Sequence, residues 1–169
     1  MSDNYLIDDI NATLTKLLSQ RMQEIGRAAD MLWIGFGDDI IYVNLKGMSV
    51  VKSEYALHIQ CNWEITDGNE VILDQGDFNI PEDETPLELF DVEQFGNSKF
   101  DKMSVEFNTT IKANPTYVVS FDAYITGGFR LELSNNFMMR VYPSSPPEGE
   151  SWRFLMPGSD EEHLVVFED

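Results

Sequence analysis

The chain has 169 residues, of which 30 are acidic and 11 basic, so its formal net charge is −19 at pH 7. This charge repels phosphate backbones and anionic lipid headgroups, which excludes nucleic acids and acidic membranes as partners. Hydrophobic residues make up 43% of the chain and aromatic residues 12%, a composition typical of a folded protein. The length favours a single domain over residues 1–169.

Two further features predict the compartment. No run of about 18 apolar residues occurs, and the first ten residues are acidic where a signal peptide carries positive charge. A single cysteine, Cys61, rules out an internal disulfide, so the fold needs no oxidising environment. We therefore expect a cytoplasmic protein that does not enter a membrane.

The first predicted element is an amphipathic helix over residues 4–18, because apolar residues recur there at intervals of three and four. Residues 27–37 and 40–45 are rich in aromatic and β-branched residues, which predicts two strands joined by a turn at Asp38 and Asp39. Helix and strands thus follow each other within the first third of the chain.

The clearest strand is predicted at residues 55–65, where apolar and polar residues alternate. Its apolar face, expected in the core, contains Tyr55, Leu57, Ile59, Cys61, Trp63 and Ile65. The Asp67-Gly68 pair that follows predicts a hairpin into another strand.

The middle of the chain interrupts the strands. Residues 79–97 contain prolines and an acidic run, which predicts an irregular connection with a short helical turn at residues 87–90. Apolar residues at helical spacing then predict a second amphipathic helix over residues 98–111, with Asn97 as its N-cap.

Three strands are predicted next, at residues 117–125, 129–133 and 137–143, separated by turns rich in glycine and asparagine. The phase of their apolar residues favours three-residue loops, with Ile125 opposite Phe129. One apolar face is then continuous across all three strands.

The last two predicted strands are residues 151–157 and 163–168, joined by an acidic turn. Together the elements predict an α+β fold. We expect a mainly antiparallel, curved sheet of about seven to nine strands, with the two amphipathic helices packed on it.

Three segments resemble a family of uncharacterised bacterial proteins of similar length. They are RAADMLWIGFG at residues 27–37, YALHIQCNWEI at residues 55–65 and ESWRFLMPGSDEEHLVVFE at residues 150–168. The resemblance runs from about residue 27 to the end, and it departs at Glu64, where the family carries a basic residue. It implies one compact bacterial domain and no established activity.

The polar face of the strand at residues 55–65 consists of His58, Gln60, Asn62 and Glu64, together with Ala56. A row of neutral hydrogen-bonding groups that ends in a carboxylate can bind a polar ligand, and His58 can act as an acid or base near neutral pH. The alternative is that the row lies half-buried under a helix and satisfies its own hydrogen bonds. The residues leave both interpretations open.

Asp30 lies within a predicted strand, where a buried carboxylate requires a partner. An ion pair is the favoured interpretation, and the candidate cations are Arg27, Arg130, Arg140 and Arg153. The alternative is that Asp30 and Glu64 work together as acid and base at a ligand site.

No metal or cofactor is predicted. His58 and Cys61 have a spacing found among zinc ligands, but they lie on opposite faces of a strand, and Cys61 is expected to be an inert core residue. Residues 35–37 lack the third glycine and the helix of a phosphate-binding loop. Residues 67–69 fit a hairpin turn better than a calcium loop.

Acidic residues are spread along the chain, with runs at residues 8–9, 38–39, 82–84 and 160–162. A negative surface built from such runs attracts a basic partner. The sequence therefore favours a non-catalytic protein-binding domain, by analogy with acidic immunity proteins that neutralise toxins. The alternative is a small-ligand-binding protein or an enzyme that uses the strand face around His58.

Overall fold

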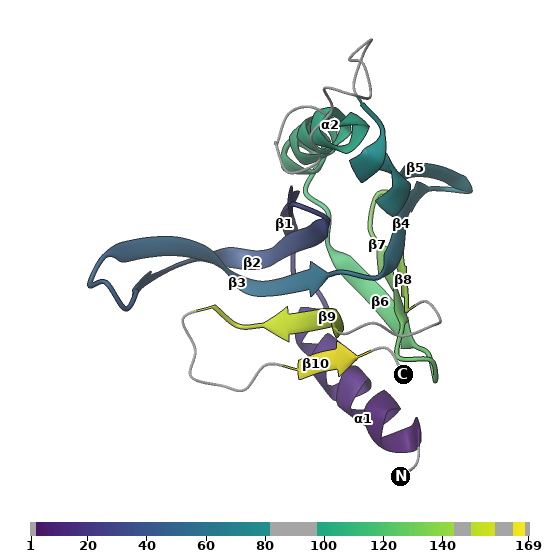
Figure 1. Cartoon of the computed structure of the whole chain (residues 1–169), viewed down its shortest axis with the longest axis horizontal. Coiled ribbons are helices and arrows are strands. Elements are labelled where there is room, and N and C mark those ends of the chain that lie inside the picture. The colour runs from purple at the N-terminus through teal and green to yellow at the C-terminus, as the bar shows by residue number, and fades with distance from the viewer. Residues whose placement is uncertain (1–2, 82–97, 144–149, 158–163, 168–169) are drawn as a thin grey trace.

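The computed structural model describes residues 3–81, 98–143, 150–157 and 164–167, and it shows an α+β fold. The described residues form ten strands in two antiparallel sheets of five strands each, together with two α-helices (Figure 1). The predicted fold class is therefore confirmed. The strands slightly outnumber those expected, and they are divided between two sheets.

The first sheet has the strand order β1 (Met22–Ala28), β2 (Met31–Val43), β3 (Ser49–Ile59), β9 (Glu150–Leu155) and β10 (Leu164–Phe167). The second sheet has the order β5 (Glu70–Asp74), β4 (Asn62–Asp67), β8 (Phe137–Tyr142), β7 (Phe129–Leu133) and β6 (Val118–Ala123). The helical elements are α1 (Asp3–Leu14), η1 (Thr15–Leu17), η2 (Gln75–Asn79) and α2 (Lys99–Ala113).

Both sheets turn their apolar faces toward one core, and α1 and α2 lie at opposite ends of the molecule (Figure 1). Ile10 of α1 and Phe107 of α2 are among its buried side chains. Near α2, the ring centroids of Trp63, Phe78 and Phe100 lie 4.7 to 5.9 Å apart. Burial of this apolar surface is the main force that holds the two sheets together.

The predicted strand at residues 55–65 is divided between the two sheets. β3 ends at Ile59 and β4 begins at Asn62, so the chain crosses from the first sheet to the second in between. The inward side chains stay buried across this break, with Cys61 only 3% and Trp63 only 2% exposed. The polar face of the predicted strand is therefore shared between two different sheets.

The turn predicted at Asp38 and Asp39 is wrong. The chain instead turns at Ala29 and Asp30, where Ala29 has a φ of 54°. β2 continues through Asp38 and Asp39 because a register shift around Gly37, with a φ of 82°, absorbs the irregularity as a bulge.

The predicted N-cap of the second helix is also corrected. Ser98, and not Asn97, is the N-cap of α2. The Ser98 hydroxyl accepts a hydrogen bond from the Asp101 amide at 3.1 Å, and the Asp101 carboxylate accepts one from the Ser98 amide at 3.1 Å. This reciprocal capping box satisfies two backbone donors at the start of the helix.

The strands β6, β7 and β8 form the predicted meander with one register correction. Ala123, and not Ile125, lies opposite Phe129. The Tyr124 amide donates to the Gly128 carbonyl at 2.9 Å, which closes a three-residue loop that starts one position earlier than expected. Ile125 is therefore 60% exposed in the loop.

β9 and β10 pair antiparallel, as predicted for the last two strands. The acidic turn between them lies outside the described residues, and so does the helical turn predicted at residues 87–90. Among the helices that are described, none is sufficiently long and apolar to cross a membrane.

Candidate functional site

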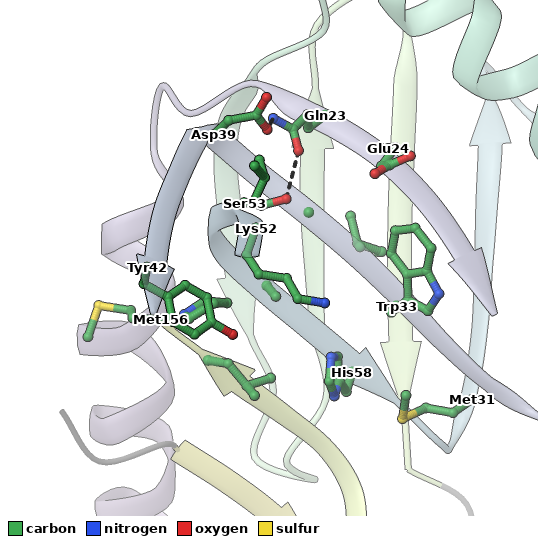
Figure 2. A pocket seen from close by; sticks show the side chains of 16 residues that line it. Gln23, Glu24, Met31, Trp33, Asp39, Tyr42, Lys52, Ser53, His58 and Met156 are labelled. Atoms are coloured by element: carbon green, nitrogen blue, oxygen red, sulfur yellow. Dashed lines mark hydrogen bonds between the residues drawn. The ribbon is translucent and has the colours of Figure 1, made fainter. Parts of the chain in front are cut away.

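A groove of about 790 Å³ lies on the outer face of the first sheet, away from the core (Figure 2). Residues of β1, β2, β3 and β9 and the two residues after β9 line it. Its apolar lining includes Trp33 and Tyr42 from β2, together with Met31 and Met156. The groove is thus built from three consecutive strands and from β9, which follows much later in the sequence.

Two glycines leave room for side chains that line the groove. A Cβ atom on Gly26 would lie 2.2 Å from the Trp33 indole, so the missing side chain leaves room for this ring beside β1. A Cβ atom on Gly35 would lie 2.1 Å from the Ser53 hydroxyl. The absence of both side chains leaves room for Trp33 and Ser53 on the outer face of the sheet.

Polar side chains on one side of the groove are held by a chain of hydrogen bonds. The Ser53 hydroxyl donates to the Gln23 amide oxygen at 2.7 Å, and the Gln23 amide nitrogen donates to Asp39 at 2.6 Å. Figure 2 shows the Lys52 side chain reaching from β3 toward the middle of the groove. The groove therefore presents a cation, a carboxylate and apolar rings side by side.

His58 is the one candidate from the sequence that lies in this groove. It is half-buried, and it pairs with Trp33 of β2 on one side and Arg153 of β9 on the other. The Arg153 guanidinium in turn bonds to Glu150 at 2.7 Å. His58 thus lies between Trp33 and Arg153 across the sheet.

The other candidates do not join His58. Gln60 is exposed at the crossing between the sheets, where its amide donates to Glu150 at 2.9 Å. Asn62 and Glu64 lie on β4 in the second sheet. The face predicted to be one polar row is therefore distributed over separate surfaces.

Asp30 also lies elsewhere, in the exposed turn between β1 and β2. The expected buried ion pair of Asp30 is wrong, because the buried cation Arg27 pairs with Asp101 of α2 at 2.6 Å. With Asp30 exposed in this turn and Glu64 on β4, the structure does not bring these two carboxylates together.

Glu64 belongs to a row of charged residues across the outer face of the second sheet. Cross-strand pairing places these residues in the order Asp74, Glu64, Arg140, Arg130, Asp122. Arg140 lies 3.8 Å from Glu64, and Arg130 forms an ion pair with Asp122. Each arginine therefore has a carboxylate beside it.

Tyr142, next to this row, should titrate above its ordinary pKa of 10.0. Burial raises the pKa of Tyr142 first, and the charge of Glu64 and a hydrogen bond to it raise it further. The folded chain therefore favours the protonated form of Tyr142 more than the unfolded chain does. The contribution of Tyr142 to the free energy of unfolding is fully present below pH 10, and it is lost as the pH rises through the raised pKa.

Glu64→Gln should therefore lower the pKa of Tyr142 toward 10.0, as followed by tyrosinate absorbance. The chain has six tyrosines, so the same titration of Tyr142→Phe identifies the contribution of Tyr142. An identical tyrosinate curve for wild type and Glu64→Gln would show that Glu64 does not act on Tyr142.

The described residues contain no group of three His, Cys, Asp or Glu side chains placed to hold a metal ion. Cys61 is buried in the core, as expected. The acidic pairs at residues 8–9 and 38–39 are exposed, on α1 and β2 respectively, whereas the runs at residues 82–84 and 160–162 lie outside the described residues.

The sequence did not reveal a surface of exposed apolar side chains that adjoins the groove. Residues 39–53, the outer half of the β2–β3 hairpin and its loop, are called the arm. Its exposed apolar side chains are Ile41 at 74%, Val43 at 67%, Leu45 at 108%, Met48 at 61% and Val51 at 58% exposure. Their alternation in the sequence is that of an ordinary half-buried strand, so it gave no sign of exposure.

The chain matches no family model, and it has no significant match among curated proteins or solved structures. The geometry of the groove and the arm is therefore the basis for assigning a function.

Proposed function

We propose that this chain is a protein-binding domain without catalytic activity, and that the groove and the arm of the first sheet receive a partner that carries positive charge. The observation behind this proposal is the cluster of five exposed apolar side chains on the arm. A contiguous apolar patch on an otherwise charged surface is typical of a protein interface.

The groove continues the apolar surface of the arm. Tyr42 and Val51 belong to the arm and also line the groove, where Trp33, Met31 and Met156 add further apolar surface. Aromatic and methionine side chains are enriched at the centres of protein interfaces because they bury large areas and adapt to the partner. The groove and the exposed apolar side chains of the arm thus adjoin each other at Val51, which lines the groove and pairs with Ile41.

Charge supports a basic partner. With a net charge of −19, the chain attracts cationic proteins over a distance of about one Debye length and repels acidic ones. Neutralisation of a basic toxin by an immunity-type protein is one form of this function. We also propose a cytoplasmic location and a bacterial origin, which fit the single buried cysteine and the resemblance to uncharacterised bacterial proteins.

Serine substitutions on the arm test this proposal. Ile41→Ser combined with Val43→Ser should weaken partner binding by about thirtyfold or more, which corresponds to about 2 kcal/mol for the loss of central apolar contacts. The immobilised full chain is first used to capture its partner at low salt, and Kd is then measured with the purified partner.

The matched control carries Val105→Ser and Val119→Ser, which replace two valines that are 56% and 57% exposed on α2 and β6. The control should bind as the wild type does, and high salt should weaken binding by both. Failure to capture any salt-sensitive partner, or equal loss of binding in the arm variant and the control, would contradict the proposed function.

A further inference from the structure

Within the described residues the arm has two open strand edges, one on β2 and one on β3. β1 pairs with residues 31–36 of β2, and β9 pairs with residues 56–59 of β3. Within the described part of the chain, residues 39–43 and 49–53 therefore have only each other as strand neighbours. Figure 1 shows this two-stranded ribbon extending away from the rest of the molecule. An isolated two-stranded ribbon is only marginally stable in water.

The direction of the backbone groups follows from the loop at the end of the arm. The Asn44 amide donates to the Met48 carbonyl at 2.9 Å, so this pair bonds across the ribbon. Pairing alternates in antiparallel strands, which makes Ile40 and Tyr42 bond to β3. Asp39, Ile41 and Val43 therefore point their amide and carbonyl groups outward, along the open edge of β2.

The edge of β1 differs from this open edge. The Asn108 side chain from α2 accepts a hydrogen bond from the Ile25 amide at 2.8 Å and donates one to the Ile25 carbonyl at 2.9 Å. Asn108 thus covers the backbone of the edge strand β1 at Ile25. Within the described residues nothing covers the apolar edge of β2 in the same way. Uncovered apolar edges promote pairing with another chain, and proteins usually protect them.

Charge along the open edge of β2 indicates which kind of chain fits it, because the two lysines of the arm, Lys46 and Lys52, lie in the loop and on β3. The exposed carboxylates Asp38 and Asp39 lie at the inner end of this edge, beside the exposed apolar side chains of Ile41 and Val43. A second copy of this chain would bring together two molecules that each carry a charge of −19, which opposes self-pairing. An extended segment with alternating basic and apolar residues matches both the carboxylates and the apolar side chains.

We propose that an extended basic segment of the partner adds as a strand to the open edge of β2 along residues 39–43. Its backbone bonds to the outward groups of Asp39, Ile41 and Val43, its apolar side chains pack on Ile41 and Val43, and a basic side chain reaches Asp38. This inference rests on the proposed function and specifies how the partner is held.

Amide hydrogen exchange of the full chain, followed by NMR, tests strand addition directly. The probe is a short capped peptide of alternating lysine and valine, and the control peptide has glutamate in place of each lysine. At about ten times its Kd, the lysine peptide should slow exchange at Asp39, Ile41 and Val43 by about tenfold, because only the free fraction exchanges. Ile40 and Tyr42 already bond to β3 and should change little.

Two variants at one position separate backbone pairing from side-chain docking. Ile41→Pro removes an outward amide without breaking a bond to β3, whereas Ile41→Ala shortens the side chain and keeps the amide. Ile41→Pro should lose about tenfold more affinity for the lysine peptide than Ile41→Ala, which corresponds to one lost backbone hydrogen bond. Circular dichroism checks that both variants fold.

Strand addition is overturned if the lysine peptide does not bind, if it binds without slowing exchange at the outward amides, or if both Ile41 variants bind it equally. Stronger binding of the glutamate peptide would overturn the basic character of the segment. In each of these cases the proposed function still stands if the arm variant loses a captured partner. Conversely, failure to capture a partner contradicts the proposed function whatever the peptide does.

Discussion

Arg27→Met should lower the free energy of unfolding by about 3–5 kcal/mol, because it leaves the Asp101 carboxylate buried without its cation. The side chains of Arg27 and Asp101 are each 1% exposed. They bond through Nε to Oδ1 at 2.6 Å and through Nη2 to Oδ2 at 2.7 Å. Asp101 also caps α2, so the pair joins this helix to β1. Urea unfolding followed by circular dichroism measures the loss.

Arg153→Met is the matched control for this prediction. Arg153 pairs with Glu150 at a similar distance of 2.7 Å, but its side chain is 38% exposed. Exposed ion pairs contribute about 0–1 kcal/mol, so the control should cost little. Equal losses for Arg27→Met and Arg153→Met would show that burial of the Arg27 pair does not determine its effect.

Trp152→Ala should cost about 3–5 kcal/mol, the range for loss of a large aromatic side chain from a core. Trp152 of β9 is fully buried, and its ring centroid lies 4.7 Å from that of Phe129 in β7. Its indole N–H donates to the Gly127 carbonyl at 2.8 Å. Since β9 belongs to the first sheet and β7 to the second, this side chain joins the two sheets.

Trp152→Phe separates the two contributions of this side chain. Phenylalanine keeps a ring against Phe129 but leaves the Gly127 carbonyl without its donor, which should cost about 1–3 kcal/mol in addition to the smaller ring. Thermal and urea unfolding should rank wild type above Trp152→Phe and Trp152→Phe above Trp152→Ala. A stability of Trp152→Ala equal to that of the wild type would contradict this role in joining the sheets.

Periodicity in the sequence predicted the elements well where one face of an element meets the core. The helix at residues 98–111 and the strand pattern at residues 55–65 both follow from apolar spacing. The same pattern could not show that residues 55–65 change sheets, because both sheets face one core and the inward positions stay in phase through Cys61.

Turns and partners were harder to predict, because they depend on contacts distant in the sequence. The pair Asp38-Asp39 has the composition of a turn, but a bulge at Gly37 keeps β2 extended through it. Arg27 was one of four candidate partners for Asp30, but it pairs with Asp101, which is 74 residues away on α2. Local propensity gives no information about that pairing.

The candidate site was predicted only in part. His58 lies in the groove, but the groove itself depends on the register of four strands, which brings Trp33, Tyr42 and Met156 around it. A sequence pattern gives the face of a residue within its own strand and not the neighbours that the sheet supplies. For the same reason, the arm resembles a core strand until its free edges are known.

Hydrogen exchange of the full chain, free and in complex with its captured partner, tests the central proposal most directly. If the groove and the arm bind the partner, protection on binding should concentrate in residues 31–58, and it should disappear for the Ile41→Ser, Val43→Ser chain at the same partner concentration. Protection confined to the strands of the second sheet, with the arm exchanging as in the free chain, would contradict the proposal that the groove and the arm bind the partner.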